Sequence, residues 1–378
     1  HSGEDVKLIK RNGSVITNRV NKIYTYNGLQ KKEVKSASAG DIVTIAGLES
    51  IDVGETVADK DNAIALPVIN IDEPTMAMEF LVNDSPFMGR SGKWLTSNKI
   101  YERLQKELQS NISLVVERTE SADRFIVKGR GELQLSILIE NMRREGYEFQ
   151  VSKPKVIFKE ENGFVLEPME IATVDVAQEY MGAVIELMGK RKGELTNMSS
   201  AIDGYSRLEF IVPSRGLIGF RNEFLTETRG TGILNQCFYK YGVYKGEILS
   251  IKHGSLIAME TGVALGYSLN NFQPRGTLFI NPNTEVYSGM IVGEHNKDND
   301  LVINVCRGKK LTNMRASGSD DAIKLSPPRF FSLELALEYI EDDELLEITP
   351  DSIRMRKKIL DHTARKRFEN KIERQDAS

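Results

Sequence analysis

Residues 124–151 read RFIVKGRGELQLSILIENMRREGYEFQV, and this stretch decides the fold. Its first four residues are typical of a strand, and residues 147–151 predict another strand after Gly146, which ends the segment between them. That middle segment predicts a helix with one apolar face, formed by Leu135, Leu138, Ile139 and Met142. Together they predict a strand–helix–strand half of an α/β unit.

The preceding residues supply the other half of this unit. Residues 76–82 predict a strand, and a helix follows with Ile100, Leu104 and Leu108 at i, i+4 and i+8. A further strand is predicted at 113–117, so the order over residues 71–152 is βαββαβ. This is the ferredoxin-like arrangement.

Residues 153–242 repeat the order of elements without repeating the residues. Ser214 is the expected cap of this unit's second helix, which runs to Glu227, and Asp203-Gly204 is a hairpin turn signal. The predicted strands are 171–176, 195–202, 206–212 and 233–239, and the first helix presents Tyr180, Val184, Leu187 and Met188. We therefore predict a second ferredoxin-like domain.

The two flanks differ from this pattern. Residues 4–70 are short strand-like runs with turn signals at Asn12-Gly13 and Asn27-Gly28, which indicate a partial β-barrel. Residues 243–378 predict a β-rich C-terminal domain, with a short helix at 333–340 and a hairpin at 346–355. The fold class is α+β multidomain. The chain begins within strand-like sequence, so we expect it to be a portion of a longer protein.

Composition limits the classes of function. The formal net charge is −4, so any nucleic-acid surface must be a local basic patch. The two cysteines, Cys237 and Cys306, are typical of free thiols in a reducing cytoplasm. No run approaches the ~18 apolar residues of a membrane span. We expect a cytoplasmic protein with no membrane partner.

No catalytic motif is recognisable. A phosphate-binding loop needs G-x-x-x-x-G-K-[ST], and the nearest sequence, Gly92-Lys93, is followed by Trp94. Asn296-Lys297-Asp298 resembles the guanine-reading N-K-x-D, but its Asp comes one position early. The histidines are too scattered to indicate a metal site. We predict that this chain is not an enzyme, has no metal or cofactor, and binds neither GTP nor GDP.

The most unusual segment is VCRGKKLTNMRASGS, residues 305–319. It has four cations, no acid, two glycines and several neutral donors, which together suit contact with phosphate. An ordinary solvated loop explains the composition equally well. The candidate RNA-binding residues are Arg307, Lys309, Lys310, Thr312, Asn313, Arg315 and Ser317. We expect this loop to be exposed and more mobile than the neighbouring strands.

Two further basic groups are candidates. Arg215 and Arg221 lie near the helix start predicted at Ser214, where free N–H groups favour anions. The alternative there is a cap with tight packing. Arg356, Lys357 and Lys358 belong to the basic stretch 354–374, and the acidic run 341–344 offers the alternative that the two fold together.

Several of these segments resemble one family. Residues 85–93, 129–133 and 140–146 resemble domain III of translational GTPases of the BipA/TypA type, and residues 213–221 resemble the helix opening of their domain V. Residues 308–318 are the most specific match, because they resemble a loop of the C-terminal domain that is peculiar to this family and absent from elongation factor G and LepA.

The resemblance implies a role. It implies a ribosome- and RNA-binding C-terminal portion of a ribosome-associated GTPase, involved in large-subunit assembly and in stress or cold adaptation. The implied partners are the 70S ribosome or its large subunit, ribosomal RNA and A-site tRNA. GTP and Mg would belong to a GTPase domain outside this sequence. The alternatives are a protein-only adaptor module and a fragment of an elongation factor G- or LepA-like factor.

Overall fold

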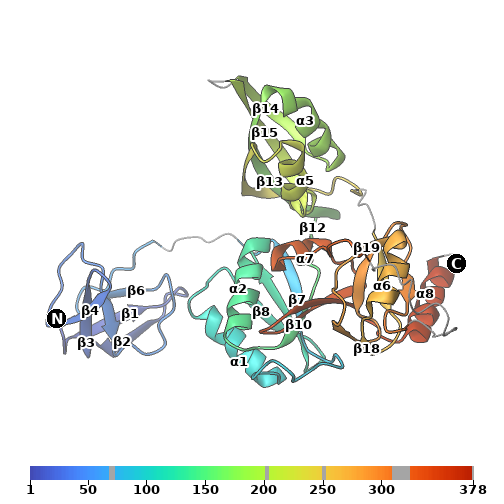
Figure 1. The fold of residues 1–378 in the computed structure, drawn as a ribbon. Helices are drawn as coiled ribbons and strands as arrows, with labels where there is room; N and C mark the ends of the chain where they lie inside the picture. The colour runs from blue at the N-terminus through green and yellow to red at the C-terminus, as the bar shows by residue number, and fades with distance from the viewer. Residues whose placement is uncertain (68–72, 201–203, 249–252, 309–323, 377–378) are drawn as a thin grey trace, which may run out of the picture. The chain divides into compact units, whose positions relative to one another are not determined.

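The computed structural model describes residues 1–67, 73–200, 204–248, 253–308 and 324–376, and shows a mixed α+β protein with several separate sheets (Figure 1). This confirms the predicted fold class. The chain forms two compact units, His1–Glu73 with Gln105–Ser113, and Pro74–Leu104 with Leu114–Ser378.

The first unit contains two small antiparallel sheets. One has the order β2-β1-β6 and the other β4-β3-β5, and the described residues form no closed barrel. Leu8, Ile9, Val20 and Ile23 are buried in this unit. The strands are β1 Asp5–Ile9, β2 Val15–Arg19, β3 Lys22–Asn27, β4 Gln30–Val34, β5 Thr44–Ala46 and β6 Thr56–Asp59.

The second unit begins with the predicted ferredoxin-like order. Its sheet has the order β10-β7-β9-β8, in which the last strand lies beside the first. The helices contribute apolar faces, Ile100 and Leu104 from one and Leu135, Leu138, Ile139 and Met142 from the other, as the spacing predicts. The elements are β7 Met76–Val82, α1 Ser97–Leu108, β8 Val115–Arg118, β9 Arg124–Gly129, α2 Glu132–Arg144 and β10 Phe149–Ser152.

The same sheet is extended by a hairpin from much later in the chain. β23 (Glu344–Ile348) pairs antiparallel with β10, and β24 (Ile353–Lys357) pairs with β23 (Figure 1). In addition, β11 (Lys155–Val156) pairs antiparallel with β7. The hairpin predicted around the Pro350-Asp351 turn is present, and it completes a sheet whose other strands lie before residue 157.

A second ferredoxin-like sheet follows, as predicted. Its strand order is β16-β13-β15-β14, with β12 at the other end of the long β13. Val174, Val184, Leu208 and Phe220 belong to its core. The elements are β12 Lys159–Glu161, β13 Phe164–Ala177, η1 Gln178–Tyr180, α3 Met181–Lys190, β14 Glu194–Ser200, β15 Tyr205–Pro213, α4 Ser214–Leu217, α5 Phe220–Glu227 and β16 Ile233–Val243.

One helix prediction in this unit is wrong. The structure has two short helices, α4 and α5, instead of one helix from Ser214 to Glu227. Ile218 is extended and Gly219 adopts φ 69°, a left-handed conformation that interrupts the helix. Ser214 is the first helical residue, and its side chain makes no cap hydrogen bond.

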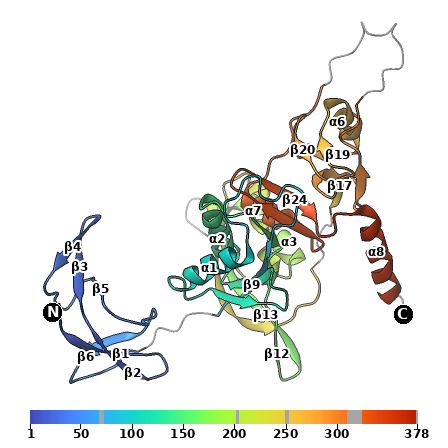
Figure 2. The ribbon, with the colours of Figure 1, turned by 90° about the horizontal axis from the view of Figure 1, so that it is seen from below.

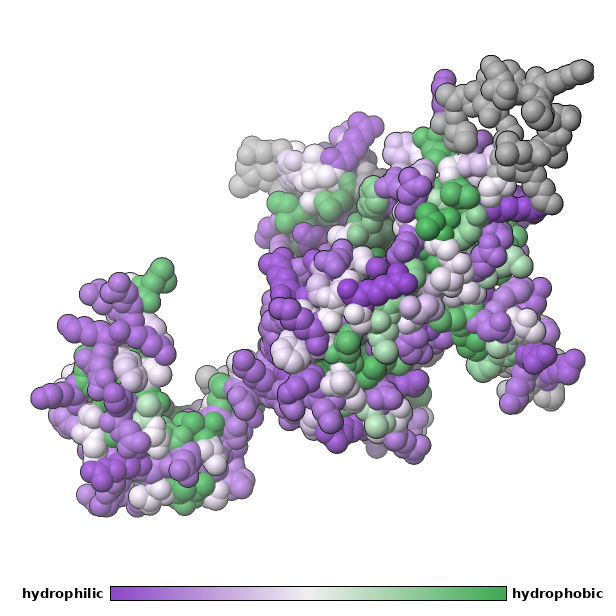
Figure 3. Space-filling view, turned by 60° about the horizontal axis from the view of Figure 1, so that its bottom comes forward, coloured by the Kyte–Doolittle hydropathy of each residue, from purple (hydrophilic) through white to green (hydrophobic). Residues whose placement is uncertain are grey.

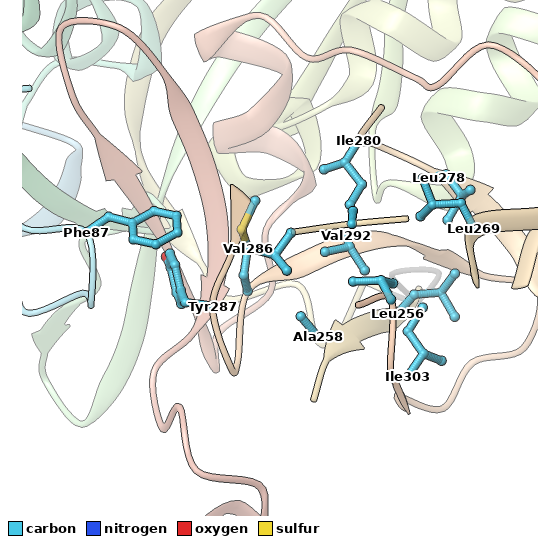
Figure 4. Packing of buried hydrophobic residues seen from close by; sticks show 13 residues of the cluster. Phe87, Leu256, Ala258, Leu269, Leu278, Ile280, Val286, Tyr287, Val292 and Ile303 are labelled. Carbon is cyan, nitrogen blue, oxygen red and sulfur yellow. The ribbon is translucent and has the colours of Figure 1, made fainter. Parts of the chain in front are cut away.

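The third group of strands forms a four-stranded sheet with the order β19-β21-β17-β22. Its core includes Leu256, Val286, Tyr287 and Val292, and Phe87 from the first ferredoxin-like unit joins it through an edge-on contact with the Tyr287 ring, centroids 5.0 Å apart (Figure 4). The elements are β17 Gly254–Ala258, β18 Gly262–Val263, α6 Gly266–Phe272, η3 Gln273–Arg275, β19 Gly276–Leu278, β20 Glu285–Val286, β21 Ile291–His295, β22 Leu301–Ile303, α7 Leu333–Tyr339 and α8 His362–Asp376.

Helix α2 packs against α7 and carries an unusual carboxyl group at its first residue. The sequence places Glu132 favourably at a helix N-terminus, but the structure largely buries this side chain and leaves its Oε1 without a hydrogen-bond partner. Burial, followed by repulsion from Glu338 and Glu334 of α7, raises the pKa of Glu132 to about 7. The folded state therefore holds a proton that the unfolded chain releases at lower pH.

This carboxyl group predicts a pH-dependent stability. Its contribution is fully present below pH ~4.5 and is lost as the pH rises to about 7, because the folded state binds the extra proton only in that window. We expect Glu132→Gln to match the wild type near pH 4.5 and to exceed it by up to about 3 kcal/mol at pH 8. Urea unfolding followed by fluorescence of Trp94, the single tryptophan, measures this. The exposed Glu120→Gln is the control, and parallel pH profiles for all three proteins would refute the assignment.

Candidate nucleic-acid interface

The residues on both sides of 309–323 attach to the same short helical segment. Ser268 of α6 donates a hydrogen bond from Oγ to the carbonyl of Arg307 at 2.5 Å. On the far side, the backbone N–H of Ser326 donates to Oε1 of Gln273, the first residue of η3, at 2.8 Å. α6 lies next to the strands of the four-stranded sheet (Figure 2), and η3 leads directly into β19 of that sheet. The structure thus fixes both ends of the candidate loop on α6–η3.

Most of the predicted loop residues lie outside the described residues. Arg307 is described and exposed, and its backbone carbonyl is the group that accepts the hydrogen bond from Ser268 of α6. The expectation that this loop is exposed and mobile concerns the same undescribed segment. The residues in that segment are Lys309, Lys310, Thr312, Asn313, Arg315 and Ser317.

Arg215 is engaged within the protein. Its Nε and one terminal nitrogen donate to the two carboxylate oxygens of Glu167 at 2.5 and 3.1 Å, and the same terminal nitrogen reaches the carbonyl of Gly246 at 2.5 Å. The guanidinium also lies 4.7 Å from the ring centroid of Tyr244. Glu167 is fully buried, so removing Arg215 would leave an uncompensated buried charge. This geometry gives Arg215 a structural role in joining α4 to β13.

Arg221 has a different setting. It is exposed on α5, one residue after the helix begins. Its charge lies close enough to Glu338 of α7 to lower that carboxyl's pKa, although burial raises the Glu338 pKa overall. Arg221 is therefore accessible to an external anion.

Lys357 is buried among acidic side chains. Its Nζ lies 2.7 Å from Asp300, 2.8 Å from Asp343 and 2.9 Å from Glu344, and 4% of the side chain is exposed. Burial alone would lower the pKa of Lys357, but the three carboxylates raise it above its usual value. The acidic run 341–344 thus folds back on the basic stretch, the alternative left open by the sequence.

The neighbours of Lys357 divide between the interior and the surface. Arg356 is 1% exposed, and donates to Asp84 at 2.5 Å and to the carbonyls of Lys357 and Lys358. Lys358 is exposed, and its Nζ donates to the carbonyl of Asp342 at 2.5 Å. In this structure Arg356 and Lys357 secure the hairpin, and only Lys358 of the three faces solvent.

A buried polar network that sequence reasoning missed holds residues 83–92. Glu148, fully buried, accepts hydrogen bonds from the N–H groups of Gly89 and Gly92 at 2.9 and 3.0 Å, and from Asn83 Nδ2 at 2.7 Å. A Cβ on Gly92 would come within 2.4 Å of Glu148 Cβ. The glycine permits this close approach, and an internal carboxylate occupies the N–H groups that a phosphate would need.

The described residues limit other kinds of site. None of their His, Cys, Asp and Glu side chains form a group of three or more suited to a metal ion. None of the helices described here is long and apolar enough to cross a bilayer.

Comparison with known proteins identifies the family. Residues 164–252, the second ferredoxin-like sheet, match the model for the elongation factor G C-terminus, and residues 253–362 match the TypA/BipA C-terminal domain. A Bacillus subtilis protein named large ribosomal subunit assembly factor BipA is 51% identical over 98% of this chain. The chain belongs to the BipA/TypA family. Family members of the same name from Haemophilus influenzae and Synechocystis are 52% and 49% identical over 96% and 94% of the chain.

The match to BipA covers part of each relative. The chain spans 60% of the length of the Bacillus subtilis and Synechocystis BipA proteins and 59% of the Haemophilus influenzae one. The TypA/BipA model begins just before β17 and ends at the first residue of α8, so it contains α6, η3 and the hairpin β23–β24.

Proposed function

We propose that this chain binds the ribosome and ribosomal RNA, and that it serves large-subunit assembly as the name of its relatives states. The observation that carries the proposal is about 50% identity to large ribosomal subunit assembly factor BipA over nearly the whole chain. The match to the TypA/BipA C-terminal domain favours this family over an elongation factor G- or LepA-like fragment.

The proposed contact surface is the segment 307–317, carried by α6–η3, with Arg221 and Lys358 as exposed additional cations. Arg307 supports this placement, because it is exposed where both ends of the segment are attached to one element. Arg215, Arg356 and Lys357 are assigned to internal ion pairs instead. Contact with A-site tRNA is the finer part of the proposal, and rests on the resemblance of residues 308–318 to the family's loop.

The chain's proposed role is binding rather than catalysis. The sequence contains no G-x-x-x-x-G-K-[ST], and the loop nearest to it donates its N–H groups to Glu148. GTP hydrolysis by the whole protein, with Mg, is proposed for a domain outside this sequence. The four ranges proposed as domains are 4–70, 71–152, 153–242 and 243–378, with the hairpin β23–β24 of the last range completing the sheet of the second.

Co-sedimentation with purified ribosomal subunits tests this proposal. We expect the chain to pellet with large subunits in preference to small subunits, with binding that weakens as salt rises, because phosphate contacts release counterions. Adding GTP or GDP should change nothing. Absence of pelleting with large subunits at low salt would refute the proposal. Binding to isolated large-subunit proteins but not to ribosomal RNA would favour the protein-only adaptor.

A further inference from the structure

The last helix, α8, carries three of its cations on one face. At about 100° per residue, Arg367, Lys371 and Arg374 fall within about 60° of one another around the helix axis. Over about two turns these cations form one continuous stripe, about 10 Å long at 1.5 Å per residue.

The structure shows which side of α8 faces the protein. Arg365, 7% exposed, donates to the carbonyls of Ile359 and Leu360 at 2.7 and 3.0 Å. Asp361 caps the helix by accepting a hydrogen bond from the N–H of Ala364 at 2.7 Å. Arg365 lies about 160° around the axis from Arg367, so the stripe points away from the anchored side.

Most of the described side chains of α8 face solvent. Arg367, Lys371 and Arg374 are exposed, Phe368 is 54% exposed, and Arg365 is the only buried residue among the described side chains of the helix. The three cations are therefore available to a partner. In Figure 2, α8 carries the chain to its C-terminus.

We propose that the Arg367–Lys371–Arg374 stripe of α8 is a second RNA-binding element, which contacts the phosphate backbone independently of the loop. This inference rests on the proposed ribosome association. Three exposed cations on one helix face, without an acid among them, complement a continuous line of phosphates. A membrane surface is disfavoured because interfacial helices need a broad apolar face, and α8 has only Phe368 and Ile372 as large apolar residues.

The test uses Arg367→Ala, Lys371→Ala and Arg374→Ala together in the full chain. Alanine favours helix, so the fold should persist, and circular dichroism checks this. The probe is a fluorescein-labelled 24-base-pair RNA duplex of mixed sequence, titrated at several salt concentrations. Losing three phosphate contacts should flatten the log–log salt dependence by about three units and weaken binding on the order of a hundredfold near 0.15 M salt. The matched control removes Lys31, Lys32 and Lys35, which are exposed in the first unit.

Each outcome decides the inference. Weakening in the α8 variant alone supports it. The inference is overturned if the α8 variant binds the duplex as the wild type does, or if the control variant is weakened equally. It is also overturned if the α8 variant loses affinity only for phosphatidylserine vesicles or polyglutamate and not for RNA. Parallel sedimentation with large subunits separates the two proposals. If the wild type pellets with large subunits and the duplex titration is unchanged, only the α8 inference fails. If the wild type does not pellet, the proposed function fails whatever the duplex titration shows.

Discussion

Replacing Glu347 with alanine should destabilise the second unit by about 3–5 kcal/mol, because the carboxylate is fully buried and satisfies four donors. It accepts hydrogen bonds from Asn83 Nδ2 at 3.0 Å, Ser85 Oγ at 2.7 Å and Tyr287 OH at 2.7 Å, and pairs with Arg354 at 3.3 Å. Removing it takes this acceptor from the Ser85 and Tyr287 hydroxyls and leaves the Arg354 guanidinium without its carboxylate, each at a cost of desolvation. Asn83 keeps its bond to Glu148.

The hydrogen bonds of Glu347 connect the β23–β24 hairpin to the sheet of the first ferredoxin-like unit. Asn83 and Glu347 are 264 residues apart in sequence, so their bond ties the chain's late hairpin to the end of β7. Tyr287 adds the four-stranded sheet to the same carboxylate. Burial and the Glu347 charge raise the pKa of Tyr287, so the tyrosine remains a donor at any ordinary pH.

Urea unfolding reported by Trp94 measures the loss, since Trp94 forms a bridge with Tyr147 beside Glu148 in this sheet. Asp351→Ala is the control, an exposed carboxylate in the turn of the same hairpin, and should shift stability by no more than about 0.5 kcal/mol. Tyr287→Phe should cost about 1 kcal/mol, as it removes one hydrogen bond. A loss below about 1 kcal/mol in Glu347→Ala would show that the hairpin does not depend on this carboxylate.

Local patterns in the sequence were enough for both ferredoxin-like units. Apolar spacing located α1, α2 and α3, and the order βαββαβ implied the strand order found in each sheet. The pairing of β23 with β10 was not predictable in this way, because nearly 200 residues separate them and neither strand's pattern specifies its partner. The break between α4 and α5 was missed because Gly219 reads equally as a packing glycine within a helix.

The candidate site, like the fold, was only partly predictable from the sequence. Composition identified Arg307 and the following cations as a basic loop, and charge spacing identified residues 354–374 as a basic end. Neither pattern showed that Lys358 is exposed while its neighbours Arg356 and Lys357 are buried, since burial depends on distant carboxylates such as Asp84 and Asp300. For Glu148 the only local signal was the glycine-rich loop 89–92, which is equally typical of a loop that binds an external anion.

Changing Lys309, Lys310 and Arg315 together to alanine should weaken binding to large ribosomal subunits on the order of a hundredfold near 0.15 M salt. All three residues lie outside the described part of the structure. The expectation therefore rests on their positive charge. Each cation that contacts a phosphate releases counterions, and the log–log salt dependence should therefore flatten by about one unit for each lost contact. The fold should not change, because the loop's attachments at Ser268 and Gln273 are retained.

The controls separate phosphate contact from other causes of weaker binding. Lys309→Arg, Lys310→Arg and Arg315→Lys preserve all three charges, so this variant should keep the wild-type salt dependence if the loop acts through charge on phosphate. The Lys31, Lys32 and Lys35 triple variant removes the same charge elsewhere and should bind like the wild type. A solvated loop predicts no change in either affinity or salt dependence. Wild-type binding by the alanine variant at two salt concentrations would therefore remove the loop from the proposed interface, while leaving Arg221, Lys358 and α8 to be tested separately.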